Sequence, residues 1–424
     1  MKWLGAVLLT VVVSAPAFAG ADPRPLSLAE ALSLAEQNAV AVIQAQGQKR
    51  AAAAGVRSAY AAFLPSLSVS ARASRQIHRG EEPWSFGSGL GANMTLFAGG
   101  GRFFDLRQAR AQATGAEAGL LAQRYATALS VKEQFFGVLA ARESEAVAGA
   151  QLEQATQQLR ISVLRLRQRV VTRSDSLRSE IQVHNAQLAV LQARTALEFA
   201  DATLTRTVGS ATPVTAAADD SLDRPGLALD DEQLRAQVLD GPAVREASAS
   251  VDGARAALRG TWTGYLPSVS ASYSRSASGA GPDLADFSLL NDGFSRSGSF
   301  GLSLSLPVFT QFQNEQRVTQ SQVARENAEA VLRDVRLTAL AGLTQSLGSF
   351  HAAEERVAIQ TATVQAAGED LRMQKDKYEI GAATLLDVLT SQTTLDQARR
   401  DLIQARYDKR TARAQLEALV GRSL

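Results

Sequence analysis

The chain changes from a strand pattern to a helix pattern between residues 90 and 112. Apolar residues at every second position alternate there with small polar ones, and a period of two is typical of a strand with one apolar face. The apolar members are Leu90, Ala92, Met94 and Leu96. After three glycines at 99–101, more than sixty residues follow without a proline. We therefore expect the strand to lead directly into a very long helix.

The same junction recurs near residue 300, as part of a wider duplication. Three leucines there alternate with serines, namely Leu302, Leu304 and Leu306. The Leu-Pro-Ser motif at 64–66 returns 202 positions later, and Asp175 returns 212 positions later as Asp387. The offset grows only once, within the Gly-, Ser- and Asp-rich stretch 278–293. We infer two copies of one unit that differ mainly in one loop.

Each copy is predicted to contain a first helix, a strand pair, a long helix and a return helix. The helices are expected at about 29–62, 102–167 and 176–208, and again at about 231–264, 314–377 and 388–420. Strands are expected at about 66–78, 84–97, 267–277 and 294–309. Asn38 and the pair Gly241-Pro242 are predicted to break the two first helices early. At 1.5 Å per residue, each long helix reaches about 100 Å.

Heptad spacing predicts that the long and return helices of the first copy pack as a coiled coil. Leu152, Leu159 and Leu166 lie seven residues apart on the long helix. On the return helix, a run of residues steps by four and three, which predicts the matching seam. Its members are Leu177, Ile181, His184, Leu188 and Leu191.

The N-terminus has the pattern of a secretory signal peptide. Lys2 precedes an apolar run of about ten residues, and Ala17-Phe18-Ala19 fits a cleavage site. A retained anchor is the alternative, but a bilayer span needs about twenty residues. The chain contains no cysteine, so we expect neither disulfides nor a lipid anchor. The predicted division is a signal peptide at 1–19, a first repeat at 20–210, a linker at 211–230 and a second repeat at 231–424.

The strands are amphipathic, but the helices available to cover them are weakly apolar. A membrane barrel, with lipid outside and water inside, explains this pattern better than a soluble sandwich. The residues predicted to face lipid are Trp84, Phe86, Leu90, Met94, Phe300, Leu302, Leu304 and Leu306. Four strands are too few to close a barrel, for which about eight are needed. Several copies of the chain must therefore contribute strands together.

Charge and composition favour no catalytic or nucleic-acid-binding function. Lys and Arg total 44 and Asp and Glu total 42, a net charge of +2 that provides no basic field for nucleic acid. The glycines at 99–101 lack a following Lys-Ser/Thr, so we interpret them as a turn and not as a phosphate cradle. His78, His184 and His351 lie far apart without metal-ligand spacing. We expect no enzyme activity, metal or cofactor.

Several motifs together resemble the TolC-type outer-membrane efflux proteins. The carriers are Thr95–Arg102 (TLFAGGGR), the Leu-Pro-Ser pair, Val171–Asp175 (VTRSD), Tyr378–Gly381 (YEIG) and Asp387–Leu389 (DVL). The resemblance covers about residues 28–421 and includes the duplication. It implies an α+β fold in which a homotrimer forms a twelve-stranded transmembrane β-barrel and a periplasmic α-barrel of long coiled-coil helices.

The resemblance also implies a function and a location. The protein would be the passive exit duct of a tripartite efflux or type I secretion system in the outer membrane of a Gram-negative bacterium, with most of the chain in the periplasm. Its partners would be the lipid bilayer, a periplasmic adaptor (membrane fusion protein) and an inner-membrane pump of the RND, ABC or MFS type. A soluble periplasmic coiled-coil adaptor or scaffold is the alternative.

The resemblance finally implies functional residues at the periplasmic tip. Asp175 and Tyr378 match a closing contact pair, and Asp387 matches an aspartate that narrows the tip. The tip turns and adaptor-docking positions correspond to Arg169, Thr172, Arg173 and Gly381. Two positions depart from the family pattern, because Arg169 replaces a glycine and Ala383 replaces an arginine that some members carry. Asp175 and Asp387 could instead be simple helix N-caps, since each precedes a return helix.

Overall fold

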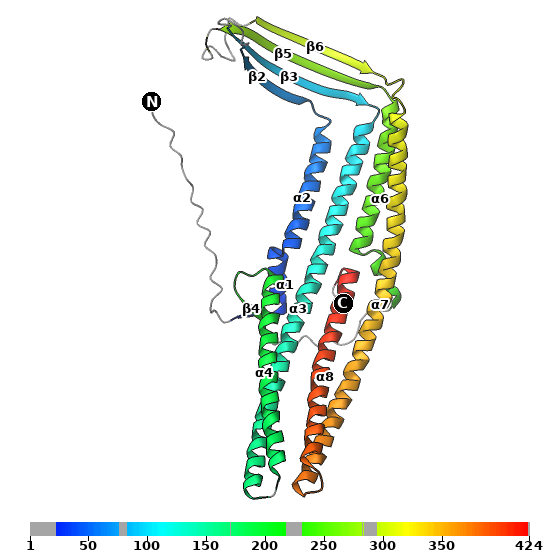
Figure 1. The fold of residues 1–424 in the computed structure, drawn as a ribbon. Coiled ribbons are helices and arrows are strands. Elements are labelled where there is room, and N and C mark those ends of the chain that lie inside the picture. Colours follow the sequence, from blue (N-terminus) through cyan, green and yellow to red (C-terminus); the bar gives the residue numbers. More distant parts are fainter. Residues whose placement is uncertain are drawn as a thin grey trace, which may run out of the picture. The chain divides into compact units, whose positions relative to one another are not determined.

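The computed structural model describes residues 23–75, 83–169, 171–217, 231–281, 283 and 295–422. The predicted signal peptide, His78 and most of the predicted linker lie outside these residues. In chain order the elements are β1 (Arg24–Leu26), α1 (Leu28–Asn38), α2 (Val40–Ala61), β2 (Ser66–Ser74), β3 (Trp84–Ala98), α3 (Gly101–Arg167), α4 (Arg173–Val208), β4 (Val214–Ala216), α5 (Asp231–Leu239), α6 (Pro242–Thr261), the 3-10 helix η2 (Trp262–Tyr265), β5 (Ser268–Gly281), β6 (Ser295–Ser305), α7 (Gln313–Glu379) and α8 (Leu385–Val420), as Figure 1 shows.

The helix boundaries confirm the duplication. The long helices α3 and α7 contain 67 residues each, and the return helices α4 and α8 contain 36 each. Every boundary of α7 and α8 lies 212 positions after its counterpart in α3 and α4. The early breaks are confirmed as well, since α1 ends at Asn38 and α6 begins at Pro242. Proline is favoured there because the first turn of a helix needs no N–H donor.

The chain divides into two compact units. The helical unit comprises Met1–Gln44, Ala122–Val238 and Leu340–Leu424, and the sheet unit comprises Ala45–Leu121 and Leu239–Ala339. α3 and α7 each contribute one part to both units. No helix among the described residues combines the length and apolarity needed to cross a membrane.

The sheet unit contains a four-stranded antiparallel sheet in the order β2-β3-β5-β6. Its register places serines and glycines of all four strands on one face, which we call the polar face. Hydroxyl pairs bridge β5 and β6 there, such as Ser270–Ser303 at 2.7 Å and Ser274–Ser299 at 2.8 Å. The opposite face, which we call the apolar face, carries Leu90, Phe300 and Leu302. The predicted amphipathic strands are thereby confirmed.

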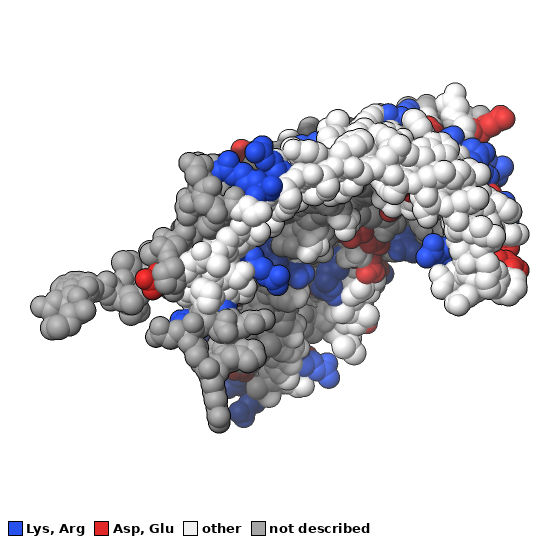
Figure 2. Space-filling model, turned by 90° about the horizontal axis from the view of Figure 1, so that it is seen from above, with Lys and Arg blue, Asp and Glu red and all other residues white. Residues whose placement is uncertain are grey.

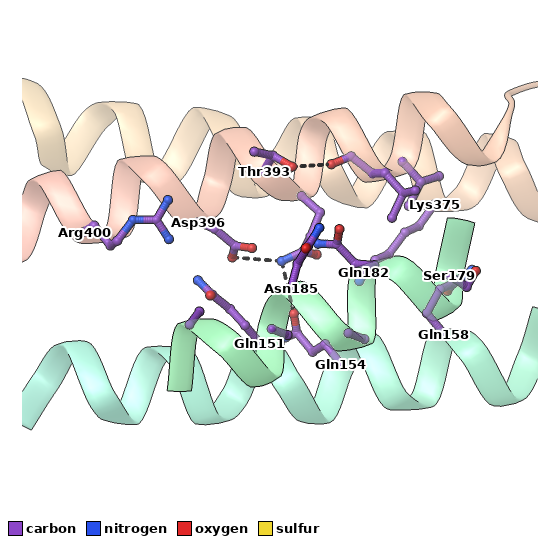
Figure 3. Close-up of a pocket in the computed structure, with 16 residues that line it drawn as sticks. Gln151, Gln154, Gln158, Ser179, Gln182, Asn185, Lys375, Thr393, Asp396 and Arg400 are labelled. Carbon is purple, nitrogen blue, oxygen red and sulfur yellow. Dashed lines mark hydrogen bonds between the residues drawn. The ribbon is translucent and has the colours of Figure 1, made fainter. Parts of the chain in front are cut away.

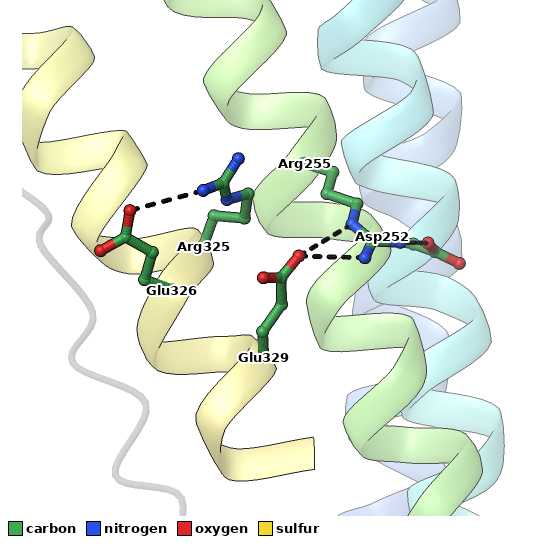
Figure 4. A network of polar contacts seen from close by, with 5 residues as sticks. All are labelled: Asp252, Arg255, Arg325, Glu326 and Glu329. Atoms are coloured by element: carbon green, nitrogen blue, oxygen red, sulfur yellow. Dashed lines mark hydrogen bonds and ion pairs between the residues drawn. The ribbon is translucent and has the colours of Figure 1, made fainter. Parts of the chain in front are cut away.

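Ion pairs connect the helices α6 and α7 of the sheet unit (Figure 4). Arg255 on α6 donates to Glu329 Oε1 on α7 through Nη2 at 2.9 Å and Nε at 3.2 Å. Asp252 also lies 3.9 Å from the Arg255 guanidinium. Because the Arg255 side chain is half exposed, we expect the pairs to contribute about 0.2–1 kcal/mol each.

A short parallel pair of strands, β1 and β4, lies in the helical unit, and β4 falls within the region predicted to be a linker. Arg24 pairs with Val214 and Leu26 with Ala216, and all three residues of β4 are buried. Leu26 and Val214 belong to a core that includes Phe135. The sequence around β4 showed no periodicity, because a three-residue strand is too short to alternate. Its partner β1 lies at the opposite end of the first repeat, so no local pattern indicated the pairing.

The predicted seam on α4 is wrong, because its large apolar residues face outward. Leu177, Ile181, His184, Leu188 and Leu191 are all exposed, and Leu191 is 62% exposed. A second stripe of smaller residues faces α3 instead, and its buried members include Ser179, Val183 and Ala186. Val183 and Ala186 pack with Ala155, Leu152 and Leu159. Small residues let two helices approach closely, so they form the contact while the larger stripe remains open.

Candidate functional site

The turns at the ends of the two long helices have the same left-handed backbone at equivalent positions. Gly381 has φ 78° in the second turn, and Arg169, 212 positions earlier, has φ 59°. This conformation costs little for glycine but brings the Cβ of other residues close to the backbone. Arg169 therefore occupies a strained position where the repeat partner has the suitable residue.

A capping box begins each return helix. Thr172 Oγ1 accepts a hydrogen bond from Asp175 N at 3.3 Å, while Asp175 Oδ2 accepts from Thr172 N at 3.0 Å. Thr384 and Asp387 repeat this arrangement on α8, with Thr384 N 2.8 Å from Asp387 Oδ2. The N-cap is thus the threonine, and each aspartate is the third helical residue. The predicted alternative, in which the aspartates themselves are the N-caps, is therefore wrong in this detail. The Thr-x-x-Asp spacing was the sequence signal for the capping box.

Hydrogen bonds at the second turn keep Asp387 ionised. The Thr384 hydroxyl lowers the pKa of the Asp387 carboxyl, and the Thr384 backbone amide lowers it further. The carboxylate is exposed beside the turn, so it presents a fixed negative charge to water. Asp387 is therefore a suitable residue for attracting cations or repelling anions at this end of the helices.

Tyr378 contacts an arginine that the sequence analysis did not identify. The Arg165 guanidinium lies 5.0 Å from the centre of the Tyr378 ring, which joins the end of α3 to the end of α7. The ring also packs against a cluster that contains Leu371 and Val388. Among the described residues, no hydrogen bond joins Tyr378 to Asp175, whose carboxylate bonds to Thr172. The structure therefore connects the two repeats here through Arg165.

A polar cavity of about 180 Å³ lies between the helices of the helical unit (Figure 3). Six side-chain amides line it, namely Gln151, Gln154, Gln158, Gln182, Asn185 and Gln392. Gln392 Nε2 donates to Gln154 Oε1 at 3.2 Å and to Asp396 Oδ1 at 2.9 Å. Burial raises the pKa of the Asp396 carboxyl, and the bond from Gln392 partly opposes this shift. The spacing of Gln151, Gln154 and Gln158 on one helix face was the overlooked signal.

Among the described residues, several polar pairs connect α3 of the first repeat to α8 of the second. Besides Gln154–Gln392, Tyr407 donates its hydroxyl proton to Glu143 Oε1 at 2.7 Å, and Lys132 pairs with Glu417. Glu417 is buried and Lys132 is only about a fifth exposed, so water screens this ion pair weakly. α8 therefore contacts two long helices, with α3 on this side and α7 on the other.

The residues predicted to face lipid lie on the apolar face of the sheet or directly after it. Leu90, Phe300, Leu302, Leu304 and Leu306 are exposed, and Trp84 and Met94 are half-buried. Phe86 is the exception, since it is only 1% exposed. Its cross-strand partners are Ala73 and Gly279. Phe86 therefore adds little to the exposed surface of this chain.

The described residues contain no group of three potential metal ligands. His184 Nδ1 lies 3.2 Å from Gln187 Oε1, and the His351 ring lies 5.9 Å from that of Phe350. The helical tips and the two faces of the sheet are thus the features that merit a functional interpretation.

Known proteins resemble this chain in both sequence and fold. A family model described as outer membrane efflux protein matches residues 31–210 and 238–422. Protein CyaE of Bordetella pertussis is 26% identical over 430 residues, which cover 96% of this chain and 88% of the relative. The cobalt-zinc-cadmium resistance protein CzcC of Cupriavidus metallidurans is 24% identical over 384 residues, with 91% and 87% covered.

A crystal structure of CusC, described in terms of transmembrane channel formation, shares the fold. Its TM-score is 0.79 at 17% identity, and 96% of both chains is covered. The fold is therefore that of an outer-membrane channel, with long helices and a β domain, and not that of a soluble adaptor.

Proposed function

Since this chain belongs to the outer membrane efflux protein family and is an efflux duct of the outer membrane with a large periplasmic part, we propose that it works as a homotrimer. Three four-stranded sheets close a twelve-stranded barrel, with the apolar face toward lipid and the polar face toward the lumen. Closure satisfies the backbone groups of the edge strands β2 and β6, which lipid would leave unpaired.

The open stripe on α4 is the observation that carries this proposal. In the second repeat, the return helix α8 is buried on two sides, and one of them contacts α3 through Gln392 and Tyr407. The equivalent side of α4 contains exposed apolar residues such as Leu188, at 53%, and Leu191. By the 212-residue equivalence, the helix that covers this side is α7 of the next copy. Burying such a stripe gains about 25 cal/mol per Å² of apolar area.

A cross-linking experiment tests this arrangement directly, because the natural chain has no cysteine. The intrachain pair Gln154–Gln392 corresponds to Ala366 on α7 and Glu180 on α4, at an offset of 212. The double variant Glu180→Cys/Ala366→Cys should form covalent dimers and trimers in membranes when treated with a short bismaleimide. Denaturing electrophoresis measures the product sizes.

The matched control is Gln154→Cys/Gln392→Cys, which should cross-link within one chain and remain a monomer on the same gel. Covalent oligomers from the control but not from the test pair would contradict the proposed order of helices around the trimer. A single monomer band from both variants, in protein that floats with outer membranes, would contradict the trimer itself.

We assign the remaining roles in the same proposal. The repeats 20–210 and 231–424 each supply one helical hairpin to the periplasmic end. The turns around Arg169 and Gly381, with Thr172 and Arg173, are the surface offered to a periplasmic adaptor bound to an inner-membrane pump. Asp175, Asp387 and Tyr378 surround the closing end of the duct, and Arg165 joins Tyr378 to the first repeat.

A further inference from the structure

The polar face of the sheet carries a single charged residue. Within Ser66–Ser74, Trp84–Ala98, Ser268–Gly281 and Ser295–Ser305, this face is otherwise composed of serine, glycine, alanine, Asn93 and Thr95. The exception is Arg72 on β2, whose position in the second repeat is taken by Ser274. Seen from above, Figure 2 shows a broad band of uncharged residues with basic and acidic side chains beside it.

Within the part of the chain that the structure describes, Arg72 has no ionic partner. It lies opposite Gly87 on β3, which pairs with Ser278 on β5, which in turn pairs with Ser295 on β6. The side chain is exposed, and among the described residues it makes no hydrogen bond or ion pair. None of the four strands contains an aspartate or glutamate. The guanidinium therefore stands above a row of small uncharged residues.

Barrel closure supplies no partner either. β2 is an edge strand, so in the proposed trimer its open side pairs with β6 of the next copy. The polar face of β6 contains only serines and Gly301. The other two arginines of the strands, Arg275 and Arg296, lie on the apolar face and point away from the lumen. Three copies of Arg72 would thus place three positive charges at one level of the lumen, where the four described strands offer no acidic residue.

We propose that Arg72 gives the outer part of the duct a preference for anions, and that it attracts the carboxylate or phosphate groups of passing solutes. This inference rests on the proposed homotrimeric duct and on the polar face lining its lumen. A ring of basic side chains selects for anions because it lowers their energy in the pore and raises that of cations. The Debye length is about 10 Å at 0.1 M salt, so the effect extends well into the lumen only in dilute salt.

The test is the reversal potential of the full-length protein in planar lipid bilayers under a potassium chloride gradient of about 0.1 M or less. The variant Arg72→Gln should lower the chloride-to-potassium permeability ratio about threefold, and Arg72→Glu should lower it about tenfold. Arg72→Lys should preserve the ratio, since the charge remains. Salt of about 1 M should remove the differences, because the Debye length shrinks to about 3 Å.

The matched control is Arg275→Gln, the same chemical change on the opposite face of the neighbouring strand pair, and its permeability ratio should equal that of the natural chain. Charges elsewhere are identical in all variants, so differences report the changed position alone. If Arg72→Gln and Arg72→Glu conduct with an unchanged ratio in dilute salt, the inference is wrong while the duct stands. If neither the natural chain nor the variant Arg165→Gln, which removes the contact at the closing end, conducts after insertion, the duct itself is wrong and this inference falls with it.

Discussion

At the scale of single residues, the two periplasmic turns differ in one side chain that determines their strain. Arg169 adopts φ 59° where Gly381 adopts φ 78°. The sequence identified Arg169 as a departure from the family pattern, but the backbone conformation that makes it costly required the structure. The sequence likewise did not single out the threonine caps, because the aspartates three residues later are themselves a favoured N-cap type.

The variant Arg169→Gly should stabilise the first turn by about 0.5–1 kcal/mol. It removes the left-handed strain of Arg169, and this gain exceeds the cost of ordering a more flexible glycine on folding. The reverse change, Gly381→Arg, should destabilise the second turn by a similar amount. Thermal unfolding followed by circular dichroism measures both. Equal unfolding temperatures for Arg169→Gly and the natural chain would contradict the prediction that Arg169 destabilises the turn.

At the scale of helices, Asp396 makes the α3–α8 contact depend on pH. Burial raises the pKa of this carboxyl in the folded state, so the fold favours its neutral form. The stabilisation that the neutral Asp396 carboxyl gives to the fold is fully present below its ordinary pKa of 3.8. It is lost as the pH rises through the raised pKa of the folded state.

Asp396→Asn keeps the acceptor for Gln392 and removes the buried charge, so it should raise the melting temperature at pH 7 by a few degrees. It should also flatten the fall in melting temperature between acidic and neutral pH. Asp401→Asn is the control, since Asp401 accepts a similar bond from Gln397 but is less buried. A lower melting temperature for Asp396→Asn at pH 7 would refute the burial argument.

Helix positions were predictable from the sequence, whereas helix contacts were not. The long apolar and polar patterns fixed α3 and α7 to within a few residues, and Asn38 marked a break correctly. The hydrophobicity of Leu188 and Leu191 suggested an internal seam, but single-sequence periodicity identifies apolar stripes without naming their partners. Here the smaller Val183 and Ala186 face α3. The polar cavity was missed because glutamines on long helices usually face water.

At the scale of the whole molecule, Arg165 and Tyr378 connect the two repeats at the end that we propose to close. A cation over an aromatic ring contributes about 0.5–1 kcal/mol at an exposed site, and three copies in a trimer would act together. The family resemblance implied a polar closing contact between Tyr378 and Asp175 instead. These two explanations predict different effects for two conservative substitutions.

Arg165→Gln removes the cation and should raise the basal conductance of the duct in planar bilayers. Tyr378→Phe keeps the ring and should leave the conductance at the natural level. If Tyr378→Phe opens the duct and Arg165→Gln does not, then the hydroxyl and not the ring holds the end closed.

The strand pair β1–β4 has a consequence for the biogenesis of the protein. β1 lies at the start of the first repeat and β4 follows its end, so their pairing brings the two ends of that half together around Leu204 and Val208. During N-to-C secretion, this strand pair needs no residue beyond Ala217. The first repeat can therefore form this strand pair, and pack Leu26 and Val214 into the core with Phe135, while the second repeat is still being threaded across the inner membrane.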